Sequence, residues 1–264
     1  MNTGTVLKFD SVTLIRDENE ILKNISFEMN FTDHLVIFGP NGAGKSSLIE
    51  IAAGFQFPSR GSVEILGEKM GQVDLAQLRL AIGYAGPRLT KMMEPGEKVF
   101  DAVISAAWGV VGRWQETYSD YDRERAKHVL ELMGMSEFQD RTIGFLSAGE
   151  KKKVEIARAL MNDPELLILD EPAASLDLPA REDLIFQLNR LIDSGLSPAI
   201  LLVTHHLEEV PTGFNRALLL DKGSVIATGK IDETLTAENL SNLYHMKIKV
   251  WQADGRRFAY RDTN

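Results

Sequence analysis

Residues 39–46 read GPNGAGKS, and this stretch decides the fold class. It fits the pattern G-x-x-x-x-G-K-[ST], it follows the apolar run HLVIF, and it opens the segment KSSLIEIAAGF, whose apolar residues recur at helical spacing. Glycines let the backbone wrap closely, so that successive N–H groups and the positive end of a helix face phosphate oxygens. The sequence therefore predicts a strand, a phosphate-binding loop and a helix in succession.

The residue types in this loop assign roles to its members. The Lys45 ammonium reaches the terminal phosphates of a nucleotide, and the Ser46 hydroxyl is a ligand for Mg²⁺. The matched strand and helix disfavour the alternative, a glycine turn with a merely solvated lysine. The motif alone fits kinases, GTPases and motor ATPases alike. The residues expected to bind the nucleotide here are Gly39, Pro40, Asn41, Gly42, Ala43, Gly44, Lys45, Ser46 and Ser47.

The bulk composition describes an ordinary globular chain. Of its 264 residues, 44% are hydrophobic and 25% charged, and none is cysteine, which excludes a disulfide framework, thiol catalysis and cysteine-ligated metal centres. The net charge of -9 disfavours broad contact with nucleic acid, because neutralising phosphates takes a surplus of Lys and Arg. The sequence contains no run of the ~20 consecutive apolar residues that a membrane-spanning helix needs. We expect a soluble, cytoplasmic chain with no specific nucleic-acid partner.

Apolar patterns along the chain predict an α/β fold with a mostly parallel sheet. The segments VLKFDSVTLI and ILKNISFEMNF predict short strands of an N-terminal β-layer, joined by a polar turn at residues 16–20. Helical patterns dominate from about residue 88 to 160 and predict a helical insert. The runs ELLILDEP, AILLVTHH and ALLLDKG predict parallel strands, and DLIFQLNRLIDSG predicts a helix between the first two.

Two carboxylates end the apolar run at residues 166–169. In open α/β folds, ligands lie at the carboxyl ends of the strands, and this places Asp170 and Glu171 at that edge. Asp170 suits a magnesium shell, and Glu171 would face the γ-phosphate and polarise the attacking water as a general base. A strand followed by an acidic helix-capping turn is the alternative, and the two carboxylates do not decide between them.

The stretch at residues 146–150 reads LSAGE and precedes a helical run. It resembles the signature motif of ATP-binding-cassette (ABC) ATPases. The resemblance implies that Ser147, Gly149 and Glu150, at a helix N-terminus, bind the γ-phosphate of ATP held by the opposite subunit. Standing alone, the motif would be only an N-cap by Ser147.

The order of motifs along the chain strengthens that resemblance. Ser175-Leu176-Asp177 resembles the D-loop, which in this family crosses the dimer interface, and Val203-Thr204-His205 resembles the switch-histidine strand. By position, His205 and not His206 resembles the residue that contacts the γ-phosphate in this family. The resemblance implies a P-loop NTPase fold with a RecA-like, mostly parallel sheet, an antiparallel β-layer and a helical insert. It also implies that Asp177 lies at the composite nucleotide site.

Two positions depart from the family pattern. An aromatic residue usually stacks on adenine from the first turn, and Arg16 occupies that position here; a guanidinium plane also stacks on a base. After the run AIGYA the family carries a glutamine that touches Mg²⁺ and senses the transmembrane partner, and Pro87 replaces it. Proline has no side-chain acceptor, so the metal shell is completed by solvent or the coupling works differently.

The expected domains are an ABC nucleotide-binding domain at residues 1–229, with a helical subdomain at about 88–160, and a short tail at 230–264. The tail, helical around residues 238–244, resembles the ends of the siderophore and vitamin B12 importer ATPases; molybdate-related ATPases also lack the glutamine. In this family, coupling helices of the transmembrane partner dock on the helical insert. The insert of this chain contains four aromatic residues, which either form such a docking surface or belong to the core: Trp108, Trp114, Tyr118 and Tyr121. The lysines at residues 151–153 predict a solvated helix face.

The leading hypothesis is an Mg²⁺-dependent ATPase subunit of an ABC transporter. It forms a head-to-tail dimer with a second copy or a paralogous subunit, and it drives transmembrane permease subunits from the inner face of the cell membrane. The alternative is a soluble cassette ATPase with a regulatory or nucleic-acid-associated role and no permease, which Pro87 favours slightly. A nucleotide kinase is opposed by the LSAGE motif.

Overall fold

The computed structural model describes residues 4–109, 116–195 and 197–263. The chain divides into two compact units: the first joins residues 1–78 with 199–264, and the second spans residues 79–198. α2 (Leu75–Leu80) lies where the chain passes from one to the other. The boundary expected at residue 230 stays a prediction.

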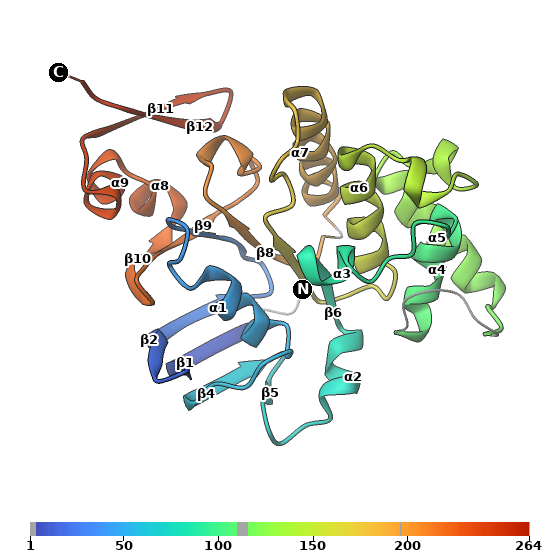
Figure 1. The fold of residues 1–264 in the computed structure, drawn as a ribbon, viewed down its shortest axis with the longest axis horizontal. Coiled ribbons are helices and arrows are strands. Elements are labelled where there is room, and N and C mark those ends of the chain that lie inside the picture. Colours follow the sequence, from blue (N-terminus) through green and yellow to red (C-terminus); the bar gives the residue numbers. More distant parts are fainter. Residues whose placement is uncertain (1–3, 110–115, 196, 264) are drawn as a thin grey trace. The chain divides into compact units, whose positions relative to one another are not determined.

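The first unit contains an antiparallel sheet in the order β2-β1-β4-β5 (Figure 1). Its long strands turn tightly at Asp17 and Glu18, whose φ angles of 50° and 66° are those of a type I′ turn. Burial alternates along β2 from Ile25 to Met29 and gives the layer one apolar face. This confirms the expected N-terminal β-layer, whose strands are β1 (Thr5–Arg16), β2 (Asn19–Asn30), β4 (Arg60–Ile65) and β5 (Glu68–Lys69).

The same unit holds four strands of a second sheet in the order β10-β9-β3-β8. β3 pairs in parallel with β8 and with β9, as its nearly complete burial requires. The phosphate loop leads from β3 into α1. The bounds are β3 (His34–Phe38), α1 (Lys45–Ala52), β8 (Ala199–Thr204), the 3-10 helix η4 (Leu207–Glu209), β9 (Arg216–Asp221) and β10 (Ser224–Lys230).

The end of the chain forms ordered structure within the first unit, where the sequence predicted only a short tail with one helical piece. α8 (Ile231–Thr234) and α9 (Ala237–Tyr244) are followed by an antiparallel hairpin of β11 (Ile248–Ala253) and β12 (Arg256–Arg261). Asp254 and Gly255 turn the hairpin with φ angles of 49° and 77°. On one face of the hairpin, the rings of Trp251 and Phe258 stack 4.5 Å apart.

The second unit pairs two parallel strands, β6 and β7, and carries the helical insert. The helices pack through small and aliphatic residues that are fully buried, such as Ala126, Val129 and Ala157. The parallel pairs in both units confirm the predicted mostly parallel sheet. The bounds are β6 (Ile82–Ala85), α3 (Pro87–Thr90), α4 (Val99–Ile104), η1 (Ser105–Trp108), α5 (Asp120–Leu132), η2 (Ser136–Phe138), η3 (Ile143–Phe145), α6 (Ala148–Ala159), β7 (Leu166–Asp170) and α7 (Leu178–Asp193).

Candidate functional site

The phosphate loop has the backbone that its glycines were expected to permit. Gly42 and Gly44 have φ angles of 80° and 102°, in the left-handed region that side chains disfavour. At Gly44 a Cβ would also lie 2.9 Å from the Leu22 side chain, and at Gly39 a Cβ would lie 2.1 Å from the Leu220 carbonyl oxygen. The loop is therefore shaped by close backbone approach, and Gly44 is the N-cap of α1.

Lys45 and Ser46 sit at the first turn of α1. The Lys45 side chain is buried, and its Nζ donates to the carbonyl oxygens of Gly39 at 2.8 Å and Pro40 at 3.0 Å. The ammonium is thus held over the loop that would enclose the phosphates. Ser46 is exposed, so its hydroxyl is accessible to a ligand at the N-terminus of the helix.

His205 lies in the same unit and lines one cavity together with Pro40 and Asn41 of the phosphate loop. Its ring packs against that of His206 with centroids 4.2 Å apart. His206 is exposed, and its backbone N–H donates to Thr204 Oγ1 at 3.1 Å. Thr204 is fully buried and donates to the buried Glu209. These two hydrogen bonds of Thr204 fix the turn that carries His205. The backbone of His206 is part of this hydrogen-bonded turn.

Arg16, the residue expected to face adenine, is the last residue of β1. Its Nη2 donates to Gln56 Oε1 at 2.9 Å and lies 3.7 Å from a carboxylate oxygen of Glu50. Glu50 belongs to α1, so the guanidinium is tied to the helix that follows the phosphate loop. More than half of the Arg16 side chain is exposed, at 54%, which leaves a face of the guanidinium accessible.

The acidic residues lie at the carboxyl end of β7, as the sequence predicted. Asp170 is the last residue of the strand and is buried. Glu171 has a φ of 48°, a conformation that costs a non-glycine residue roughly 1–2 kcal/mol. Such strain is concentrated at functional positions, because the surrounding structure must hold it in place. Ser175, in the segment that resembles the D-loop, has a positive φ of 65° as well, so this conformation occurs twice in the loop that follows β7.

The segment that replaces the glutamine of the family packs directly against Asp170. A Cβ at Gly86 would lie 2.8 Å from the Asp170 Cβ, so only glycine fits beside the acidic strand end. Pro87 begins the short helix α3, where a missing N–H costs nothing. The substitution therefore builds a regular turn at this edge, without a side-chain acceptor.

That turn is tied to the signature helix by a buried carboxylate that the sequence analysis did not single out. Glu155 on α6 is 1% exposed; it accepts from Thr90 Oγ1 at 2.7 Å and from Lys152 Nζ at 3.0 Å. Thr90 Oγ1 also lies 3.2 Å from the Gly86 carbonyl oxygen. A carboxylate inside the apolar run of α6 was the available signal, since a buried charge needs a partner.

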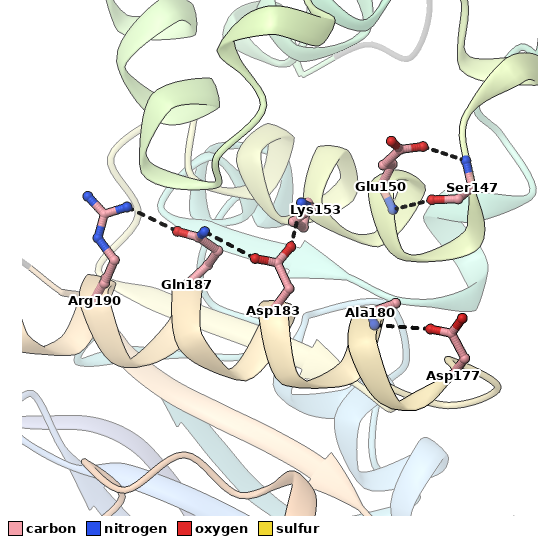
Figure 2. A network of polar contacts seen from close by, with 8 residues as sticks. All are labelled: Ser147, Glu150, Lys153, Asp177, Ala180, Asp183, Gln187 and Arg190. Atoms are coloured by element: carbon pink, nitrogen blue, oxygen red, sulfur yellow. Dashed lines mark hydrogen bonds and ion pairs between the residues drawn. The ribbon is translucent and has the colours of Figure 1, made fainter.

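The signature residues form a complete helix cap on α6. Ser147 Oγ accepts from the Glu150 N–H at 3.3 Å, and Glu150 accepts from the Ser147 N–H at 2.6 Å (Figure 2). Partial burial opposes ionisation of Glu150, but the hydrogen bonds that its carboxylate accepts from the Ser147 N–H and hydroxyl, with the charges of Arg141 and Lys153, outweigh burial and hold its pKa below the ordinary value. Ser147 is exposed, so the cap leaves the positive end of the helix accessible to an anion.

The N-terminus of α7 lies beside that of α6. Asp177 caps α7 by accepting from the Ala180 N–H at 3.0 Å. A Cβ at Gly149 would lie 2.7 Å from the Ala180 Cβ, so the two helix ends are in close contact. Lys153 Nζ bonds to Asp183 at 2.7 Å further along (Figure 2). Among the expected residues of this unit, Ser147, Gly149, Glu150 and Asp177 are thus brought together.

The lysine run and the aromatic residues of the insert differ in part from expectation. Lys152 and Lys153 are only 18% and 12% exposed and pair with carboxylates, so the expected solvated face is wrong for both.

Tyr118 is buried, as the core alternative predicted. Trp108 and Tyr121 are 57% and 73% exposed and remain candidates for a docking surface, whereas Trp114 lies outside the described residues.

Comparison with known proteins agrees with this geometry. The family model described as ABC transporter matches residues 22–174. The chain is 40% identical to the uncharacterized ABC transporter ATP-binding protein YlmA of Bacillus subtilis (strain 168) over 257 residues, which cover 97% of each chain. It is similar to the solved structure of MJ1267, an ATP-binding cassette of an ABC transporter, in its ADP conformation. The TM-score is 0.75 and the sequence identity 27%, and the match covers 92% of this chain and 96% of that one. It is also similar to the dimeric structure of MJ0796, a bacterial ABC transporter cassette, with a TM-score of 0.73 and 25% identity over 85% of this chain and 98% of that one.

The chain therefore belongs to the ABC transporter family. It is an ATP-binding subunit of this family, with ATPase activity. In the part of the chain that the structure describes, no helix is long and apolar enough to span a membrane. Each unit offers one oxygen donor of the kind that a hard divalent cation such as Mg²⁺ takes: the exposed Ser46 hydroxyl in the first unit and the Asp170 carboxylate in the second.

Proposed function

We propose that this chain works as a head-to-tail dimer in which the phosphate loop of one copy and the signature helix of the other enclose ATP. The observation that carries the proposal is an apolar face at the N-termini of α6 and α7. Phe145, two residues before the N-cap Ser147 of α6, and Leu178, the first residue of α7, are 88% and 61% exposed there. Large exposed apolar side chains around an anion-binding helix end favour a covered surface. The similarity to a dimeric cassette supports the same arrangement.

The phosphate loop supplies the binding energy for the triphosphate. The N–H groups of the loop and the N-terminus of α1 attract the phosphates, and Lys45 exchanges its two carbonyl partners for phosphate oxygens. Ser46 and Asp170 would hold Mg²⁺. When bound, this ion neutralises charge that develops on the phosphates during transfer. Arg16 presents its accessible guanidinium face to the adenine ring.

Hydrolysis is assigned to Glu171 and His205. Glu171 accepts the proton of the attacking water, and the strained backbone keeps its carboxylate at the end of β7. His205 contacts the γ-phosphate from the braced turn beside Asn41. Ser147, Gly149 and Glu150 of the second copy close the site through the positive end of α6, which stabilises the γ-phosphate. Asp177 lies at the same interface.

The partner of this dimer is a membrane permease, and the chain works at the inner face of the cell membrane. Trp108 and Tyr121 supply exposed aromatic surface on the helical insert for such contact. The Pro87 turn lacks the glutamine side chain, so we assign the link to the signature helix to Thr90 and Glu155 instead. A soluble cassette without a permease is the second candidate, favoured by Pro87 alone.

The test of the catalytic assignment is Glu171→Gln in the purified chain. We expect Mg²⁺-dependent ATP hydrolysis to fall at least about 100-fold, as loss of a general base requires, and ATP to trap a dimer in size-exclusion chromatography. Glu165→Gln is the matched control, because Glu165 is an exposed carboxylate beside the other end of β7. Full turnover in Glu171→Gln, or equal losses in both variants, would contradict the assignment.

Permease coupling is tested separately in native membranes. Affinity purification of the wild-type chain from detergent extracts should co-purify an integral membrane protein in stoichiometric amount. Trp108→Ser and Tyr121→Ser should weaken this association while the isolated chain keeps its basal ATPase activity. Recovery of the chain without a membrane protein, at full activity, would favour the soluble candidate.

A further inference from the structure

A cavity of about 400 Å³ lies within the first unit between the phosphate loop and the C-terminal hairpin. One wall is formed by Pro40, Asn41 and His205, which belong to the ATP site. The opposite wall comes from α9 and the hairpin, and its residues are Tyr244, Met246, Ile248, Ala259, Tyr260 and Arg261. Most of these side chains are apolar or aromatic, and Met246 and Tyr260 are 43% and 54% exposed.

The hairpin is fixed to the segment that follows the switch histidine. β12 packs against η4, and the Arg256 guanidinium donates to the Glu208 carbonyl oxygen. Gly255 lies close to Thr212, since a Cβ there would be 3.2 Å from the Thr212 methyl group. Arg257 is buried and pairs with Asp232 of α8. The wall of the cavity that faces His205 is therefore held in place by the fold.

In the second unit, an exposed apolar tip is coupled to the signature helix. Leu178, the first residue of α7, is 61% exposed, and Pro179 beside it is also exposed. Two contacts hold the first turns of α7 against α6: Gly149 lies close to Ala180, and Lys153 forms an ion pair with Asp183 (Figure 2). Any subunit that brings Ser147 to a phosphate loop must therefore bring Leu178 to the edge of that loop as well.

We propose that the cavity receives the tip formed by Leu178 and Pro179 of a second copy, so that the C-terminal hairpin is part of the dimer interface. This inference rests on the head-to-tail dimer of the proposed function and adds a contact to it. The apolar walls match the apolar tip, because burial of a leucine favours association. Charge matches too: Asp177 directly precedes the tip, and Arg261 lines the cavity.

Engineered cysteines test the contact cleanly, because the chain has no cysteine of its own. One copy carries Leu178→Cys and a second, size-tagged copy carries Met246→Cys, both with Glu171→Gln to hold ATP. The mixture is treated with a short bis-maleimide with and without ATP, and products are separated by denaturing electrophoresis. We expect a mixed dimer band that forms at least about 10-fold faster with ATP. Because each copy has one cysteine, the mixed product reports only contact between chains.

Phe186→Cys replaces Leu178→Cys in the matched control. Phe186 is 57% exposed on the same helix, eight residues and thus roughly 12 Å further along, and its copy should not react with Met246→Cys. If ATP traps the dimer in chromatography but Leu178→Cys reacts no faster than Phe186→Cys, the inference is overturned while the proposed function stands. If ATP traps no dimer, both fail.

A second measurement does not depend on cross-linking. Leu178→Ala in the Glu171→Gln background should raise the dissociation constant of the ATP-bound dimer at least about 10-fold, because two leucines leave the symmetric interface. Arg261→Glu should weaken the dimer as well, and Phe186→Ala should not. An unchanged dissociation constant for Leu178→Ala overturns the inference.

Discussion

Lys152→Met should destabilise the protein, because it removes the cationic partner of a buried carboxylate. Glu155 is 1% exposed, and Lys152 Nζ lies 3.0 Å from one of its oxygens. Removing one member of a buried pair costs about 3–5 kcal/mol. The Thr90 hydroxyl still donates to the other oxygen at 2.7 Å, and the Lys152 side chain is 18% exposed, so some water replaces it. We therefore expect a loss of about 2–3 kcal/mol in the free energy of unfolding.

Urea unfolding followed by far-ultraviolet circular dichroism measures this loss. With a denaturant slope of about 2–3 kcal/mol per molar, the midpoint should fall by about 1 M. Lys151→Met is the matched control, since Lys151 is the neighbouring half-buried lysine, and it should stay within about 0.5 kcal/mol of wild type.

The double variant Lys152→Met/Glu155→Leu decides whether the loss comes from the unpaired charge. Replacing both members of a buried pair by apolar side chains is often close to neutral, so the double variant should regain most of the stability. A double variant no more stable than Lys152→Met, or a single variant as stable as Lys151→Met, would refute the reasoning.

Three further perturbations test the site and the hairpin. Gly44→Ala should weaken ATP binding at least about 10-fold in a fluorescent-nucleotide titration, because a φ of 102° and the nearby Leu22 side chain exclude a methyl group; unchanged affinity would contradict this. Glu171→Gly should abolish turnover yet raise the free energy of unfolding by about 1 kcal/mol, because glycine relieves the positive φ; lower stability would contradict the strain. The hydrogen bond and charge of Arg257 lower the pKa of Asp232, so the pair contributes stability above the ordinary carboxyl pKa and loses it as pH falls through the lowered value. The melting temperatures of wild type and Asp232→Asn should therefore differ slightly at pH 7, by the equivalent of ~0.5 kcal/mol, and converge below about pH 3; a constant difference would count against the pair.

Most strands and helices were predictable because their local patterns agree with their burial. The continuous apolar runs at residues 34–38, 166–170 and 199–204 became β3, β7 and β8, which are buried along nearly their whole lengths. The insert was predicted as helical from periodicity alone, and α5 and α6 follow it closely. The ends of single elements within the insert could not be predicted in this way: α4 ends at Ile104 and passes directly into the 3-10 helix η1.

The motif residues of the site were also identifiable, but their supporting contacts were not. Gly39–Ser46, Ser147 and Asp170 are specified by short patterns whose chemistry is local. The Thr90–Glu155 bond joins residues 65 positions apart, and the strain at Glu171 arises from the surrounding fold. No local pattern encodes such contacts, because they depend on which elements pack together.

The C-terminal hairpin was missed although its sequence carries a signal. Asp254-Gly255 lies between IKVWQA and RRFAYR, and such a pair between alternating residues is a strong indicator of a tight hairpin turn. Its position after the last motif favours a short tail instead. The pairing of β11 with β12 along six residues shows that turn chemistry deserved more weight than position in the chain.

The attachment of this hairpin to η4 has a practical consequence for work with the protein. The last residues of β12 line the same cavity as His205, so a purification tag fused to the C-terminus begins next to the ATP site. We therefore expect a tag at this end to alter nucleotide turnover or dimer formation although no motif residue is changed, so activities measured with and without such a tag should be compared before any residue is assigned a role.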